Sequence, residues 1–139
     1  SMSYKYLEHS TDAFIEVKAK NLEEAFSVAG KSVVETIIDL KNIQEVEKKS
    51  IKVKGRNLQN LLYNWLEEIV TITITDGFAI SNFSVNIKKS AEYEIISTVS
   101  GEKLDLEKHN FKVEIKSPTF HLMEIKENDE VTMRYLLDL

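Results

Sequence analysis

The stretch GEKLDLEKHNFKVEIKSPTFH, residues 101–121, restricts the fold of this chain more than any other segment. In its second half Phe111, Val113 and Ile115 alternate with charged residues, which predicts a strand that ends at Pro118. Acidic and histidine side chains bracket this strand: Glu102, Asp105, His109 and His121. The chain has three histidines in all, so the stretch is a candidate binding site, although a solvated face with a polar turn also explains its charges.

Two amphipathic helices precede this stretch. Asn21 is a suitable N-cap with Glu24 three residues later, and apolar residues continue at helical spacing to Leu40. Asn57 caps a second helix, in which Trp65 occupies a core-facing position. The β-branched run 70–75 that follows favours a strand by local propensity.

Alternating hydropathy predicts the remaining strands, at residues 13–20, 51–55, 78–88, 93–99, 119–125 and 131–137. The order strand-helix-strand-helix followed by four or five strands implies an α+β fold. We expect two layers, with both helices packed on one face of a mixed, largely antiparallel sheet. The chain of 139 residues has the size of one domain, residues 1–139, in which Ser1 before Met2 is expected to be a tag remnant.

Composition excludes several classes of function. There is no cysteine, so disulfides and thiolate metal sites are excluded, and no apolar run is long enough to span a membrane. We therefore expect a soluble, cytoplasmic protein. The net charge of −5 disfavours strong direct binding to nucleic acid, because such binding depends on neutralising phosphates. An acidic protein is instead suited to dock on a basic protein surface.

Three aspartates follow or precede predicted elements: Asp12 at the start of a strand, Asp39 at the end of the first helix and Asp138 at the end of the last strand. Such ends can meet at one rim of a two-layer domain, where carboxylates suit calcium or magnesium. The spacing in sequence does not establish that they meet. A zinc site formed by His9, His109 and His121 is a competing possibility, but it has no closely spaced pair of ligands.

The motifs quoted above resemble the archease family, small proteins that assist the RtcB-type tRNA-splicing RNA ligase. The resemblance includes Gly-Glu-x-x-Asp-x-x-Lys-His at residues 101–109, Thr-Phe-His at 119–121, His-Ser-Thr-Asp at 9–12, the second helix at 61–68 and Leu-Leu-Asp-Leu at 136–139. It implies that the second helix continues into residues 70–75. It also implies a divalent metal site, most simply for calcium, with magnesium as the alternative, at Asp12 and Asp138 with Asp39 and main-chain oxygens of Leu139.

The resemblance further implies a role for Lys116, Glu102, His109, His121 and His9 in contacting the ligase. The expected function is non-catalytic: the protein would promote guanylylation of the ligase and its multiple turnover during tRNA splicing. No Gly-rich phosphate loop, nucleophile elbow or metalloprotease motif occurs in the chain. Two other functions stay open from the residues, a small metal-dependent hydrolase or phosphatase and a chaperone-like interaction module.

Overall fold

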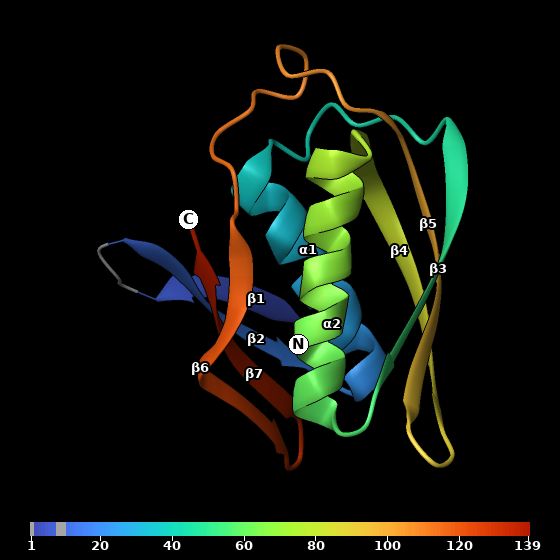
Figure 1. The fold of residues 1–139 in the computed structure, drawn as a ribbon, viewed down its shortest axis with the longest axis vertical. Helices are drawn as coiled ribbons and strands as arrows, with labels where there is room; N and C mark the ends of the chain where they lie inside the picture. The colour runs from blue at the N-terminus through green and yellow to red at the C-terminus, as the bar shows by residue number, and fades with distance from the viewer. Residues whose placement is uncertain (1, 8–10) are drawn as a thin grey trace.

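Two antiparallel sheets enclose two helices in the computed structural model, which describes residues 2–7 and 11–139 (Figure 1). Sheet A has the strand order β1-β2-β7-β6, with the bounds Ser3–Leu7, Asp12–Ala19, Val131–Asp138 and Ser117–Glu127. Sheet B has the order β3-β5-β4, with the bounds Glu47–Gly55, Tyr93–Lys103 and Phe78–Lys89. The α+β class and the predicted order of elements are confirmed, with β1 as an additional strand at the start.

Both helices begin at the predicted asparagine caps. The Asn21 side chain accepts a hydrogen bond from the Glu24 amide at 2.9 Å ahead of α1 (Leu22–Ile37), and Asn57 does the same for Asn60 at 2.8 Å ahead of α2 (Leu58–Val70). The chain then continues as one π-helical segment, Thr71–Thr75. The β-branched run is therefore helical, because burial of residues such as Ile72 outweighs its local preference for a strand.

The helices contribute to a single core that is shared by the two sheets. Trp65 is completely buried, and its indole N–H donates to the main-chain oxygen of Phe26 at 2.8 Å, which joins α2 to α1. Both helices contact strands of sheet A and strands of sheet B. The single sheet expected from sequence is thus divided into two, and the helices lie between its parts (Figure 1).

The predicted strand at residues 111–116 is wrong. These residues belong to the connection that leads from β5 in sheet B to β6 in sheet A across the end of the helices (Figure 1). Main-chain amides of this connection bond to other elements, with Lys112 N donating to Ile37 O and Lys116 N to Asp138 O, each at 2.8 Å. Alternating hydropathy reports an extended, half-buried chain, which need not pair with a neighbouring strand.

Pro118 is the second residue of β6 and does not end a strand. This position is compatible with proline because β6 is an edge strand of sheet A. Within the described residues, the two helices are too short and too polar for either to cross a lipid bilayer.

Candidate functional site

Two aspartates that are far apart in sequence face each other at one end of sheet A. Asp12 opens β2, Asp138 closes β7, and the antiparallel register places the two residues directly opposite one another. Side chains at opposite positions lie on the same side of the sheet, with their Cβ atoms about 5 Å apart. Two carboxylates in this arrangement repel each other unless a cation lies near them.

A hollow of about 570 Å³ adjoins Asp12. Asp12 and Leu139 line it together with Tyr6, Phe14 and Lys112, among other residues. Leu139 is the neighbour of Asp138, and the hydrogen bond from Lys116 N to Asp138 O holds this end of β7 against the start of β6. The hollow is thus lined by two acidic residues, Asp12 and Glu35, and by one lysine, Lys112.

Asp39 lies just beyond the end of α1 and is engaged by the connection between the sheets. Its carboxylate accepts a hydrogen bond from Asn110 Nδ2 at 2.9 Å and forms an ion pair with Lys112 Nζ at 3.3 Å. These two contacts hold the pKa of Asp39 below its usual value. The negative charge at the C-terminal end of the helix is thus offset by an ammonium group.

No group of three or more histidine, aspartate or glutamate side chains in residues 2–7 and 11–139 is arranged to hold a metal ion. Asp12 and Asp138 are paired by the strand register, whereas Asp39 is bound by Asn110 and Lys112. Of the three aspartates predicted to bind a metal ion, the structure places two, Asp12 and Asp138, opposite each other.

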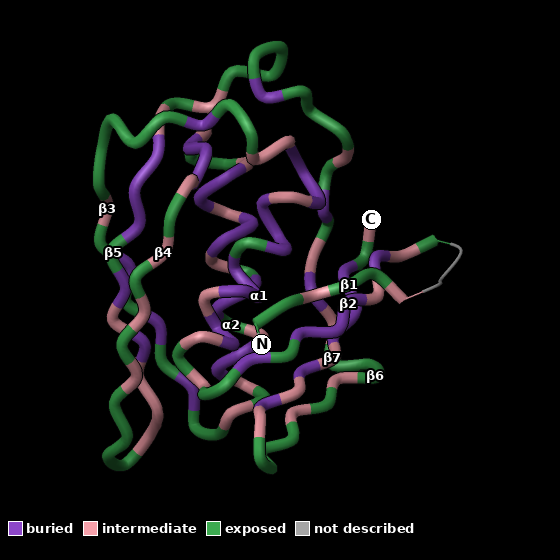
Figure 2. The backbone as a smooth tube through the Cα atoms, turned by 180° about the vertical axis from the view of Figure 1, so that it is seen from behind, coloured by how far each residue is buried: buried purple, intermediate pink, exposed green. Residues whose placement is uncertain are grey.

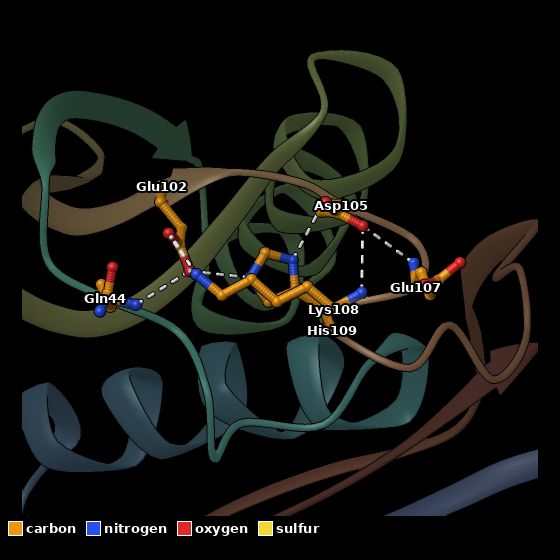
Figure 3. Close-up of polar contacts among 6 residues, drawn as sticks. All are labelled: Gln44, Glu102, Asp105, Glu107, Lys108 and His109. Carbon is orange, nitrogen blue, oxygen red and sulfur yellow. Dashed lines mark hydrogen bonds and ion pairs between the residues drawn. The ribbon is translucent and has the colours of Figure 1, made fainter.

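His109 is the centre of a second polar cluster, within the connection between β5 and β6 (Figure 3). Its ring is completely buried. Nδ1 accepts a hydrogen bond from the Asp105 amide at 3.0 Å, so the ring proton lies on Nε2, which donates to the Glu102 carboxylate at 2.8 Å. The imidazole thereby joins the end of β5 to the turn that follows it.

Glu102 is the anion of this cluster. It accepts hydrogen bonds from His109, from Lys108 Nζ at 2.9 Å and from the Gln44 amide at 3.0 Å, and together these lower its pKa to about 2. The Gln44 contact ties the cluster to the segment between α1 and β3, as Figure 3 shows. The three hydrogen bonds to Glu102 join the end of β5, the turn that follows it and the segment before β3.

The remaining predicted site residues are separated. Lys116 is exposed near the start of β6, and His121 is exposed further along that strand, where its amide donates to Thr119 Oγ1 at 2.8 Å. His9 lies outside the described residues. His109 is buried and already bonded through both ring nitrogens, which removes it as a zinc ligand in this conformation.

Comparison with known proteins assigns the fold to a family. The family model described as the Archease protein family (MTH1598/TM1083) matches residues 4–139. This chain belongs to the archease family. Curated archeases of Pyrococcus abyssi and Pyrobaculum islandicum are 35% and 34% identical to it, over 88% and 99% of this chain and 87% and 96% of their own lengths.

Solved structures agree with the archease assignment. The solution structure of Methanobacterium thermoautotrophicum protein 1598 has a TM-score of 0.80 at 28% identity and covers 98% of each chain. The crystal structure of a Thermotoga maritima archease, described as a possible chaperone, has a TM-score of 0.63 at 19% identity over 97% of this chain and 96% of that one. The latter likeness concerns the fold alone.

Sequence analysis missed two residues of this archease site. These are Lys112 and Asn110, which hold Asp39. The alternating pattern placed Lys112 on the polar side of a predicted strand, and it gave Asn110 no role. The approach of Lys112 to α1 follows from the hydrogen bond between its amide and Ile37 O, and Asn110 adopts a left-handed backbone with φ of 53°. Asparagine tolerates this conformation better than most residues, which is the one local signal of a turn at this position.

Proposed function

We propose that this archease-family chain is a non-catalytic activator of an RtcB-type tRNA-splicing RNA ligase. It would promote guanylylation of the ligase and its multiple turnover, using a divalent cation held at Asp12 and Asp138. The observation that carries this proposal is the direct opposition of these two aspartates across the β2–β7 ladder.

The donor chemistry fits a hard cation. Asp12 and Asp138 would supply carboxylate oxygens, and Leu139, which lines the hollow with Asp12, would add main-chain oxygens. This set suits calcium and, with more water, magnesium. A cation would also relieve the repulsion between the two facing carboxylates. When bound, the ion would supply positive charge at an otherwise acidic rim. Asp39 would stay with Lys112 and support the loop next to that rim.

A protein partner is consistent with what is known of a relative, since the Thermotoga maritima archease is described as a possible chaperone. The net charge of −5 suits docking on a basic surface such as that of an RNA-binding enzyme. Lys116 and His121 are exposed and are therefore available for the ligase. The buried His109 and its partner Glu102 would act by fixing the connection that ends at Lys116.

The test is RNA ligation by a cognate ligase at limiting enzyme, measured as product per enzyme with and without this protein. We expect many turnovers with the wild type and about one round with Asp12→Asn or Asp138→Asn, because each variant removes one of the paired charges. Asp129→Asn is the matched control, since Asp129 is exposed in the turn between β6 and β7.

Calorimetric titration with Ca²⁺ separates the two parts of the proposal. Loss of both Ca²⁺ binding and stimulation in the Asp12 and Asp138 variants supports a metal-bearing activating site. Full stimulation by both variants would refute the role of the cation. Failure of the wild type to stimulate a competent cognate ligase would refute the proposed partner.

A further inference from the structure

The outer face of sheet B carries lysines on both of its edge strands. Exposure alternates along the second half of β3, where Lys52 and Lys54 are exposed and Ile51 and Val53 are buried. Lys48, earlier in the same strand, is also exposed. Lys88 is exposed on the same side of β4, because the strand registers align it with Lys54 through β5. The helices cover the opposite face of the sheet (Figure 2). These four residues are called the lysine face below.

Few acidic groups neutralise the lysine face. Glu94 of β5 lies between Lys54 and Lys88 in the register, and Glu45 accepts a hydrogen bond from Ser100 near the Lys48 end. None of the four lysines forms an ion pair in the part of the chain that the structure describes. Four lysines with Glu94 and Glu45 give the face and its edge a charge of +2, so the rest of the chain carries −7, which makes the total of −5.

Side chains that are able to form hydrogen bonds lie between the lysines. The exposed uncharged positions on this side of the three strands are Ser50, Asn82, Ser84, Asn86 and Thr98, and the half-buried Ile96 is the apolar exception. Hydroxyl and amide groups of this kind contact phosphates and ribose hydroxyls in nucleic-acid complexes. The face therefore combines cations with hydrogen-bonding groups on a continuous sheet surface.

We propose that the lysine face binds the phosphate backbone of double-helical RNA. Lys52 and Lys54 are separated by two residues of extended chain, about 7 Å, and Lys48 lies about 13 Å from Lys52 along the same strand. Lys88 lies across the sheet from Lys54, so that ammonium groups on both edges of the sheet can meet phosphates of a helical backbone. Hydroxyl side chains between them can bond the 2′-hydroxyls.

Physical chemistry favours this occupant over two others. A protein partner needs large aromatic, methionine or arginine anchors, and lysine is depleted at the centre of protein interfaces. Single-stranded RNA is held by stacking on aromatic side chains, and the described exposed positions of this face include none. Double-helical RNA needs neither anchor residues nor aromatic stacking, because its phosphates are recognised through charge and shape.

The lysine face and the paired aspartates lie on different sheets. Sheet B is on the side of the helices away from Asp12 and Asp138, which belong to sheet A (Figure 1). A partner seated at the aspartates would leave the lysine face accessible. The inference concerns binding by this chain alone, so it does not depend on the proposed ligase.

The test measures fluorescence anisotropy of a labelled RNA hairpin, with a stem of about 16 base pairs, upon titration with the full chain. With three to four phosphate contacts, raising salt from 50 to 200 mM should weaken binding by roughly 40- to 150-fold. The triple variant Lys52→Gln, Lys54→Gln, Lys88→Gln should abolish this binding at 50 mM salt. The control variant Lys18→Gln, Lys20→Gln, Lys31→Gln removes the same charge from exposed positions elsewhere and should retain binding.

Several outcomes would overturn the inference. Equal losses in the two triple variants would mean that net charge alone governs binding, and absence of binding by the wild type at 50 mM salt would remove the site. A DNA duplex of the same sequence that binds as tightly would refute recognition of RNA. Lysines on edge strands also prevent strands of different molecules from pairing. Self-association of the lysine-face variant with unchanged RNA binding would assign the lysines to that role instead.

Discussion

Replacing Asp138 by asparagine should have opposite effects on stability with and without Ca²⁺. Asp138 faces Asp12 directly across the β2–β7 ladder, and like charges at opposite positions destabilise a sheet by roughly 0.2–1 kcal/mol. Asparagine has nearly the same shape and no charge. The metal-free variant should therefore be more stable than the metal-free wild type by that amount.

Calcium should reverse this order. At a free Ca²⁺ concentration 100 times the dissociation constant, a site present only in the folded state adds about 2.7 kcal/mol to the free energy of unfolding. An unfolding entropy of about 2.1 cal/mol/K per residue corresponds to roughly 0.3 kcal/mol/K for a chain of 139 residues. The wild type should then gain about 9 °C in Tm, whereas the metal-free advantage of Asp138→Asn amounts to at most about 3 °C.

Differential scanning calorimetry in EDTA and in Ca²⁺ measures both effects on the same samples. Asp129→Asn, in the exposed turn between β6 and β7, should follow the wild type in each condition. An equal gain in Tm for the wild type and for Asp138→Asn would refute the reasoning, because the facing carboxylates would then not be the ligands. The same comparison with Mg²⁺ would rank the two ions.

Two further predictions concern the start of the connection between the sheets. Gly101→Ala should lower the free energy of unfolding by about 3 kcal/mol, since an added Cβ would lie 1.9 Å from the main-chain oxygen of Ala79. Gly77→Ala should lower it by about 1 kcal/mol, because φ is +63° there but the space is open. Equal losses of stability in urea unfolding would contradict the steric argument. Glu102 has a folded pKa of about 2 against a usual 4.5, so its stabilising effect is complete above pH 4.5 and is lost as the pH falls toward 2. Glu102→Gln should flatten this acid limb of the stability curve, and an unchanged limb would show that the bonds to His109 and Lys108 do not stabilise the fold.

Local patterns were sufficient for most of the elements. Asn21 and Asn57 cap the helices as predicted, and the turn between β6 and β7 falls between the predicted strands 119–125 and 131–137. These features depend on neighbours a few residues away, which the sequence displays directly. The run 70–75 is different, because its helical state depends on packing that local propensity does not include.

The candidate site residues show the same division between what nearby residues predict and what depends on packing. The motif at residues 101–109 marked Glu102, Asp105 and His109 as related, and they do form one hydrogen-bonded cluster, because they are few residues apart on one turn. The pattern did not predict their structural role. Burial of His109 and the bonds that saturate Glu102 assign the cluster to holding the connection in place.

The α+β class, the helix caps, the chain order of the strands and the likeness to archeases could all be predicted from the order of residues. Only the tertiary structure decided that the strands form two sheets with the helices between them, that residues 111–116 connect those sheets, and that Asp12 opposes Asp138 while Asp39 pairs with Lys112. The physical reason is the range of the interactions. Hydropathy and capping depend on residues close together in the chain. Sheet register and charge pairing join residues far apart, as Asp12 with Asp138 and Asp39 with Lys112.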